Sequence, residues 1–149
     1  LDIFDRNIID YHIGLNCTGH DAAFTLKTAL KCRNIDPNES NLIVRSDNGP
    51  QFISHAFEEA CIELGVEHER IPPKTPNMNA HIEAFHRILE DDCLSINEFE
   101  TYAEAYMAVV DFMDFYCNIR IHSSINYIPP AEYYQGVLEG NIASLVVRV

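Results

Sequence analysis

The sequence predicts an α/β domain in which helices flank a mixed β-sheet. One observation is that β-rich runs alternate with stretches of helical periodicity between residues 18 and 71, which is typical of layered α/β arrangements. A second is that two β-rich runs, Leu1 to Phe4 and Ile8 to Leu15, flank the polar residues Asp5-Arg6-Asn7, which predicts a hairpin. A hairpin placed before alternating strands and helices makes the predicted sheet mixed.

The elements after the hairpin are predicted from periodicity and from start and stop residues. Those of the first half are a helix from Thr18 to Cys32 with Thr18 as N-cap and Asn34 near its end, a strand from Leu42 to Arg45, a helix that Ser54 caps and Gly65 stops, and a strand from Val66 to Ile71. Residues 72–77 contain three prolines, so they are predicted to form an exposed loop.

The second half is predicted to be helical. Asn79 is expected to cap a helix whose apolar face carries Ile82, Phe85, Ile88 and Leu89. A longer helix from Tyr102 to Tyr116 begins with a capping box of Thr101 and Glu104, and its apolar stripe is Tyr106, Val109, Val110, Phe112 and Met113. A last short helix starts at Pro129-Pro130, with proline in its first turn.

Length, hydropathy and charge restrict the class of protein. The 149 residues, 47 % of them hydrophobic, suffice for one globular domain with a core. No run approaches the ~20 apolar residues of a membrane span, and the first residues lack a signal-peptide pattern, so a soluble intracellular protein is expected. The net charge of −13 argues against a non-specific nucleic-acid binder, because neutralising phosphates needs a surplus of lysine and arginine.

The five cysteines do not indicate a zinc site. They are odd in number, far apart and without any Cys-x-x-Cys or Cys/His spacing that suits zinc. We therefore expect reduced thiols that mostly fill the core: Cys17, Cys32, Cys61, Cys93 and Cys117.

Two acidic residues are candidates for metal-dependent chemistry. Asp47 follows a predicted strand, at the edge of an α/β sheet where ligands usually bind, although Asp47-Asn48-Gly49 is also good turn chemistry and by itself favours a simple turn. Glu83 lies one turn into the helix after the proline-rich loop, with 35 residues between it and Asp47. The intervening elements can return the chain beside the first strand, and two carboxylates suffice for one Mg²⁺ ion. Composition alone makes Glu83 an ordinary surface glutamate.

The two acids lie in motifs that resemble a known family. Ser46 to Phe52, the 35-residue spacing and Asn79 to His86 are similar to the catalytic core of insertion-sequence transposases and retroviral integrases, the DDE superfamily. Phe115 to Ser124 and Tyr127 to Tyr133 resemble the end of this core in bacterial insertion-sequence transposases. The resemblance covers residues 1 to about 135 and leaves 136–149 as a C-terminal tail.

The resemblance implies a fold, a reaction and its cofactors. The fold would be RNase H-like, and the protein would cleave and join DNA by metal-dependent phosphodiester transfer in a bacterial cytoplasm, with DNA and further copies of itself as partners. An Asp, Asp, Glu triad would hold two Mg²⁺ or Mn²⁺ ions. Asp47 would be the second acid and Glu83 the third. Asp2 is a hairpin residue, 45 positions before Asp47, so the first acid and its strand are expected upstream of Leu1, and this chain alone is expected to be inactive.

The chain also departs from the family pattern. Glu90 stands where relatives often carry a lysine seven residues after the catalytic glutamate, and Cys117 and Ile119 replace the usual Asn and second Arg. Lys74 and Arg120 are candidates for DNA contacts, although a lone exposed lysine is usually just solvated and Arg120 is equally an ion-pair partner of a local acid. His122 is expected to make a hydrogen bond at a helix end rather than to act in catalysis.

Two alternatives to an active transposase domain stay open at the level of sequence. One is a catalytically silent remnant or self-association module, favoured by the acidic charge and by Glu90. The other is an RNase H-like nuclease acting on RNA-DNA hybrids, against which the Asn79 to Phe85 segment and the Tyr127 to Tyr133 tail argue.

Overall fold

The computed structural model describes residues 1–36, 41–72 and 76–145. The chain forms two compact units, Ile9–Asn79 and Leu1–Ile8 with Ala80–Val149, and each is described by itself. No helix within the described ranges is both long enough and apolar enough to span a bilayer. Lys74 lies outside the described residues.

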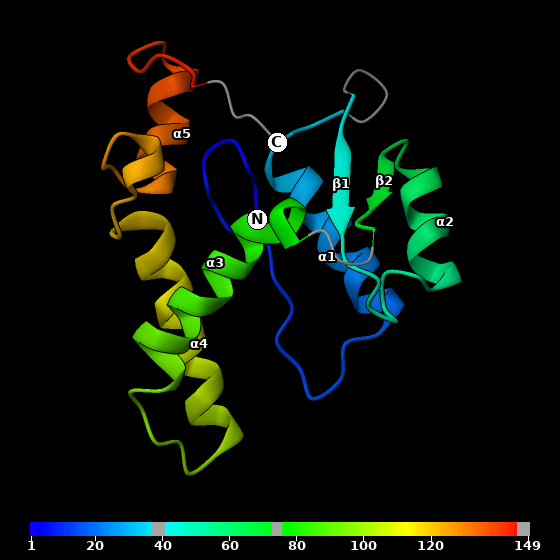
Figure 1. Ribbon diagram of the computed structural model, residues 1–149, viewed down its shortest axis with the longest axis horizontal. Helices are drawn as coiled ribbons and strands as arrows, with labels where there is room; N and C mark the ends of the chain where they lie inside the picture. Colours follow the sequence, from blue (N-terminus) through cyan, green and yellow to red (C-terminus); the bar gives the residue numbers. More distant parts are fainter. Residues whose placement is uncertain (37–40, 73–75, 146–149) are drawn as a thin grey trace. The chain divides into compact units, whose positions relative to one another are not determined.

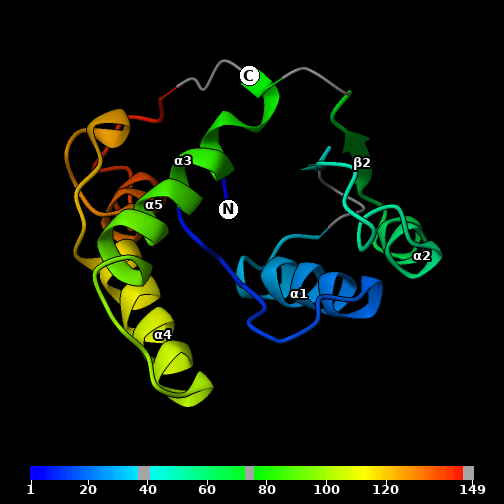
Figure 2. The same cartoon turned by 60° about the horizontal axis from the view of Figure 1, so that its bottom comes forward.

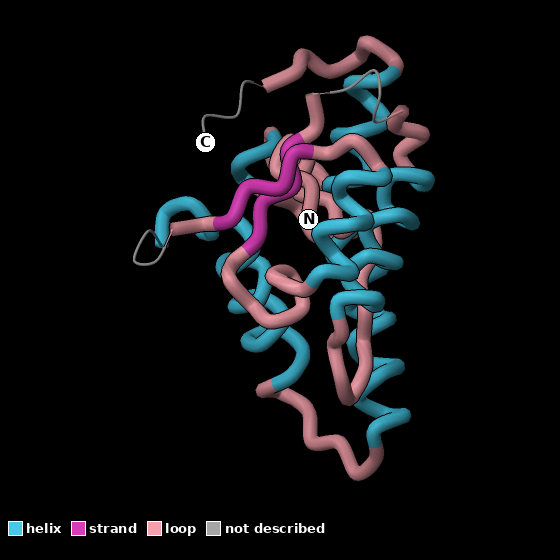
Figure 3. Tube along the Cα trace, turned by 90° about the vertical axis from the view of Figure 1, so that its right-hand side faces the viewer, coloured by secondary structure: helices cyan, strands magenta, loops and turns pink. Residues whose placement is uncertain are grey.

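The unit Ile9–Asn79 is built on a β-α-β arrangement. Strands β1 (Ile43–Ser46) and β2 (Glu67–Arg70) pair in parallel, with Ile43 opposite Glu67 and Ser46 opposite Arg70 (Figure 3). Helix α2 (His55–Glu63) connects them and packs beside β2 (Figure 1). The unit ends in a 3₁₀ turn, η1 (Pro76–Asn79).

Helix α1 (Gly19–Cys32) packs against α2 and completes the core of this unit. Its N-terminus is fixed by a capping box in which the Thr18 hydroxyl accepts from the N–H of Asp21, while the Asp21 carboxylate accepts from the N–H of Thr18. The buried side chains of this core come from the two helices and from Val66, the residue before β2; those of the helices are Ala22, Ala23, Leu30, Phe57, Ala60 and Cys61.

The predicted caps of this unit are confirmed. Ser54 caps α2 by accepting from the N–H of Phe57, and Gly65 follows the helix with φ of 63°. This left-handed conformation costs glycine no side-chain clash, which explains why the helix stops there. Asn34, with φ of 51°, ends α1 in the same manner.

The second unit is helical. Helix α3 (Ala80–Leu89) continues into a π-helical turn, η2 (Glu90–Leu94), and the chain then reverses into α4 (Tyr102–Asn118) (Figure 2). A 3₁₀ turn, η3 (Ser123–Ile125), leads to α5 (Pro130–Leu138), which packs on α4 and begins with the predicted proline. The core residues here are Phe85, Cys93, Phe112, Met113, Tyr116, Ile125 and Tyr133.

The N-terminal hairpin is the main prediction that is wrong. Residues 1–15 contain a turn but no strand. The N–H groups of Phe4 and Asn7 donate to the carboxylates of Asp2 and Asp5, at 2.9 and 2.8 Å, and the N–H of Asp2 donates to the Asn7 carbonyl. Local bonds of this kind satisfy the backbone in place of a strand ladder. Among the described residues the only sheet is therefore the parallel pair β1-β2.

Smaller corrections concern three helical residues. Asn79 is the last residue of η1 rather than a cap of α3. Thr101 caps α4 as predicted, but the Glu104 carboxylate accepts from the N–H of Glu100 instead of closing a capping box. Tyr106 is exposed and Val109 and Val110 are half-buried, so only Phe112 and Met113 of the predicted stripe are fully buried.

All five cysteines are free thiols. Cys61 and Cys93 are buried, Cys117 is half-buried, and Cys17 and Cys32 are exposed, so fewer fill the core than the sequence predicts. Burial raises the pKa of the Cys61, Cys93 and Cys117 thiols, which makes them poor nucleophiles at neutral pH.

Candidate metal centre at the end of strand β1

Asp47 directly follows β1 and its side chain is exposed. The carboxylate oxygen Oδ1 accepts from the N–H of Gly49 at 2.8 Å, which closes the turn predicted for Asp-Asn-Gly. This bond restricts the carboxylate without burying it. A turn and a cation-accessible carboxylate are thus compatible at this residue.

Glycine at position 49 keeps the space beside this carboxylate open. A Cβ atom at this position would lie 3.0 Å from Oδ1 of Asp47 and 2.7 Å from Nε2 of Gln51. Contacts this short would require both side chains to move. Any larger residue at position 49 would therefore crowd the oxygen that faces the turn.

Neighbouring side chains fasten the strand end on both sides of Asp47. Asn48 donates from Nδ2 to the Ile71 carbonyl at 2.8 Å, which ties the turn to the end of β2. Ser46 is buried; its hydroxyl donates to the Asp47 carbonyl at 2.9 Å and lies 2.8 Å from Nε2 of His68. These contacts were not predicted from the sequence, although the alternation of a strand places Val44 and Ser46 on one face.

His68 is a neutral member of this group. Burial lowers the pKa of His68, and the positive charge of Arg70 lowers it further. Its ring packs edge-on against Phe57 with the centroids 5.1 Å apart. The imidazole is therefore uncharged at pH 7 and fixed in orientation by the core.

Arg45 links β1 to the segment that leads toward Glu83. Its Nε lies 2.6 Å from Oε2 of Glu69 on β2, and its Nη1 donates to the Met78 carbonyl in η1 at 3.5 Å. The ion pair is partly buried, so it is less screened by salt than a surface pair. It helps hold the end of the unit Ile9–Asn79 in place.

Glu83 occupies the first turn of α3, and its side chain is exposed, as predicted. Asp47 belongs to the unit Ile9–Asn79 and Glu83 to the other, so their meeting at one ion stays a prediction. Within the described ranges, no three His, Cys, Asp or Glu side chains cluster as a complete metal site. A carboxylate pair completed by water and phosphate oxygens, as Mg²⁺ often accepts, requires no such cluster.

Arg120 already has an acidic partner. Its Nε lies 3.7 Å from Oδ2 of Asp92, and both side chains are partly exposed. An exposed pair of this length contributes little to stability, so the guanidinium is available to exchange one anion for another. Its role as a DNA contact stays a prediction.

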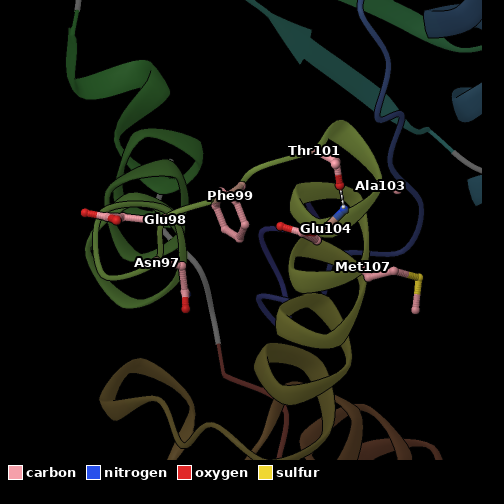
Figure 4. Close-up of a pocket in the computed structure, with 7 residues that line it drawn as sticks. All are labelled: Asn97, Glu98, Phe99, Thr101, Ala103, Glu104 and Met107. Carbon is pink, nitrogen blue, oxygen red and sulfur yellow. Dashed lines mark hydrogen bonds between the residues drawn. The ribbon is translucent and has the colours of Figure 1, made fainter.

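A hollow of about 580 Å³ lies elsewhere, at the start of α4 (Figure 4). The residues that line it are Asn97, Glu98, Phe99, Thr101, Ala103, Glu104 and Met107. Residues 88–119 contain eight acidic residues and no lysine, arginine or histidine. Phosphate groups would be repelled here, so this hollow is unsuited to DNA.

A buried polar cluster in the same unit was also missed. The Tyr116 and His122 rings pack edge-on with centroids 4.7 Å apart, and Arg6 donates from Nε to the Ser124 hydroxyl at 3.4 Å. Burial raises the pKa of Tyr116 to about 12 and lowers the pKa of His122 to about 4. His122 is therefore a buried neutral residue, and the hydrogen bond of its ring with the Tyr116 backbone, in the last turn of α4, confirms the predicted hydrogen bond at a helix end.

Comparisons with known proteins give sequence relatives for both units. Two profiles described as integrase core domain match residues 1–76 and 64–130. A 39.2 kDa protein of insertion element IS476 from Xanthomonas euvesicatoria is 42 % identical over 60 % of this chain and 26 % of its own length. The 31.7 kDa protein of IS407 from Burkholderia multivorans is 30 % identical over 89 % of this chain and 46 % of its own.

The transposase of IS904 from Lactococcus lactis is 25 % identical over 89 % of this chain and 52 % of its own length. The chain thus spans between a quarter and about half of these curated relatives.

Solved structures show the same fold. The catalytic core domain of BIV integrase aligns with a TM-score of 0.62 at 23 % identity, over 87 % of this chain and 78 % of that one. A chain of the simian T-cell lymphotropic virus intasome aligns with a TM-score of 0.60 at 18 % identity, over 81 % of this chain and 41 % of that one. The predicted RNase H-like α/β class is confirmed by these alignments.

Proposed function

Because the chain belongs to the integrase core domain family, we propose that it is the catalytic domain of an insertion-sequence transposase, which cleaves DNA and joins it to a target. The observation that carries this proposal is the exposed carboxylate of Asp47 at the carboxyl end of β1, held by its own turn. Glu83 follows after 35 intervening residues, one turn into α3. Relatives from insertion elements, among them the IS904 transposase, support the same assignment.

Asp47 and Glu83 would hold the divalent ion, Mg²⁺ or Mn²⁺. Both are exposed carboxylates, and hard oxygen ligands suit these cations. Two such ions, when bound, would activate a water or a 3′-hydroxyl and stabilise the leaving oxygen, and Asp47 and Glu83 would help to hold them. Asp47 and Glu83 would be the second and third acids of the family's triad, and the first acid stays a prediction.

The proposed partners are DNA and further copies of the chain. Arg120 can exchange Asp92 for a phosphate, and Lys74 is a second candidate contact. Self-association without chemistry is the second candidate function, because α4 exposes four large apolar side chains, Tyr102, Tyr106, Met107 and Phe115. An exposed patch of this kind is typical of interaction surfaces.

Binding of Mn²⁺ to the 149-residue chain tests whether the two acids share an ion. Mn²⁺ is paramagnetic and broadens the NMR signals of nearby amides. We expect the amides of Asp47, Gly49 and Glu83 to broaden over the same range of Mn²⁺ concentration. In Asp47→Asn, the broadening at Glu83 should weaken together with that at Gly49.

The matched control is Asp111→Asn, which removes an exposed carboxylate from α4. It should leave the broadening at both acids unchanged. Broadening at Glu83 that is independent of Asp47 would show that the two carboxylates bind ions separately, and the proposed shared site would be excluded.

Reversing the charge of Glu90 tests the approach of DNA to the same face. Glu90 follows Glu83 by seven residues, close to two helical turns, so both project on one side of the continuous helix α3-η2. In Glu90→Lys a repulsive group becomes a phosphate contact. DNA affinity should rise several-fold at 0.1 M salt, and the slope of log K against log salt should steepen by about 0.9.

Glu98→Lys makes the same charge change at the hollow beside α4 and serves as the control. It should raise DNA affinity less and leave the salt slope nearly unchanged. Equal effects of the two variants, measured by fluorescence anisotropy over a salt series, would show that DNA responds only to the net charge.

A further inference from the structure

Ser46 lies at the centre of a short chain of hydrogen bonds that ends on Asp47. The Ser46 hydroxyl contacts the Asp47 carbonyl at 2.9 Å and Nε2 of His68 at 2.8 Å. Only 6 % of Ser46 is exposed, so water does not compete freely for either contact. The three residues therefore form one connected group at the end of β1.

The number of hydrogen atoms fixes the direction of these bonds. A serine hydroxyl has one hydrogen to donate, and a carbonyl oxygen can only accept. Ser46 must therefore donate to the Asp47 carbonyl and accept from His68. This requires the imidazole tautomer that carries its hydrogen on Nε2.

The core holds His68 so that it can make this bond. His68 pairs with Val44 in the parallel ladder, and Val44 and Ser46 share one face of β1. The edge-on contact with Phe57, itself 2 % exposed, keeps the imidazole in its orientation. The Ser46 carbonyl also accepts from the N–H of Ile71 at 2.9 Å, which fastens the strand end independently.

We propose that Ser46 and His68 are positioning residues, which hold the backbone of Asp47 so that its carboxylate meets the divalent ion in one orientation. Holding the Asp47 carbonyl fixes the peptide plane that follows Asp47, and hence the backbone from which its side chain projects. Gly49 then fixes the carboxylate through Oδ1. Groups that orient metal ligands in this way commonly change metal affinity by about 10- to 100-fold when they are removed. The inference rests on the proposed function, because it assumes that Asp47 binds the ion.

The test measures the apparent Kd for Mn²⁺ from broadening of the Gly49 amide in the 149-residue chain. His68→Phe keeps an aromatic ring against Phe57 but removes the Nε2 donor, and Ser46→Ala removes the hydroxyl. Each should weaken Mn²⁺ binding about 10-fold. The double variant should weaken it no further than either single variant, because the two residues act as one chain.

His68→Gln is the rescue variant, because the glutamine amide can place an N–H where Nε2 of histidine lies. It should restore the Kd to within about twofold of the wild-type value. Glu67→Gln removes an exposed carboxylate from the other end of β2, and it should leave the Kd unchanged.

Thermal unfolding separates positioning from general support of the fold. If His68→Phe lowers the Tm but leaves the Kd at the wild-type value, the role of His68 is structural and the inference is overturned. Failure of the proposed function would look different: Asp47→Asn itself would then bind Mn²⁺ like the wild type.

Discussion

Asp47→Asn is expected to lower strand transfer and DNA nicking by the full-length protein by about 1,000-fold or more. The substitution removes a negative charge and keeps the shape of the side chain. A metal ion contributes several kcal/mol of transition-state stabilisation, and each 1.36 kcal/mol is a factor of ten in rate. The measurement is the rate of joining a labelled element end to plasmid DNA in the presence of Mg²⁺ or Mn²⁺.

Glu83→Gln should cause a loss of similar size. If the two carboxylates hold the same ions, the double variant should be no slower than either single variant, since residues that act as a unit show strongly non-additive effects. Oδ1 of Asp47 accepts the hydrogen bond from the N–H of Gly49, and asparagine has an oxygen at the same place. The fold of Asp47→Asn should therefore be intact.

Asp111→Asn is the matched control in the same assay. It lies on an exposed face of α4 and should retain the wild-type rate. A full-length protein that joins DNA equally well with and without Asp47 would exclude the proposed active site. A full-length protein that is inactive but self-associates would instead favour the second candidate function.

Local signals in the sequence were sufficient for most helix boundaries and for the β-α-β unit. Thr18, Ser54 and Gly65 act within one turn of their own helices, so their roles follow from neighbouring residues. The predicted hairpin does not form, because the carboxylates of Asp2 and Asp5 accept hydrogen bonds from nearby N–H groups. These local bonds compete with strand pairing.

Of the candidate site, only the two acidic residues could be predicted from the sequence. Asp47 and Glu83 stand in recognisable motifs, whereas the contact of Ser46 with His68 joins residues 22 positions apart through the register of two strands. Close to the buried His122, an exposed hydrogen bond joins Arg6 and Ser124, which are 118 positions apart. Contacts of this range depend on tertiary packing, which no local pattern specifies.

His122 should make the unit Leu1–Ile8 with Ala80–Val149 sensitive to acid. The residue is 9 % exposed, and within the described residues its Nε2 atom has no hydrogen-bond partner. Burial lowers the pKa of His122 to about 4, and the positive charges of Arg120 and Arg6 lower it as well, while a hydrogen bond with the Tyr116 backbone partly opposes them. Protonation would place a charge beside two cations in a poorly hydrated site.

The sign of the effect follows from the pKa values of the two states. The pKa of His122 is about 4 in the folded chain and 6.5 in the unfolded chain, so between these values the unfolded chain binds the proton more readily. Stability is therefore complete above about pH 6.5 and falls as the pH drops toward 4. The loss from this residue should be about 3 kcal/mol, and it should not grow further below pH 4.

The measurement is the free energy of unfolding from urea titrations at several pH values between 4 and 7.5. His122→Phe retains a ring against Tyr116, and His122→Asn retains a donor for the backbone hydrogen bond. Both variants are less stable at neutral pH, but they should lose about 3 kcal/mol less than the wild type between pH 6.5 and 4. His55→Asn, at a histidine whose side chain is 84 % exposed, should keep the full wild-type loss. An identical loss in the wild type and in both His122 variants would mean that the acid sensitivity arises from other groups, because His68 and the carboxylates are common to all of them.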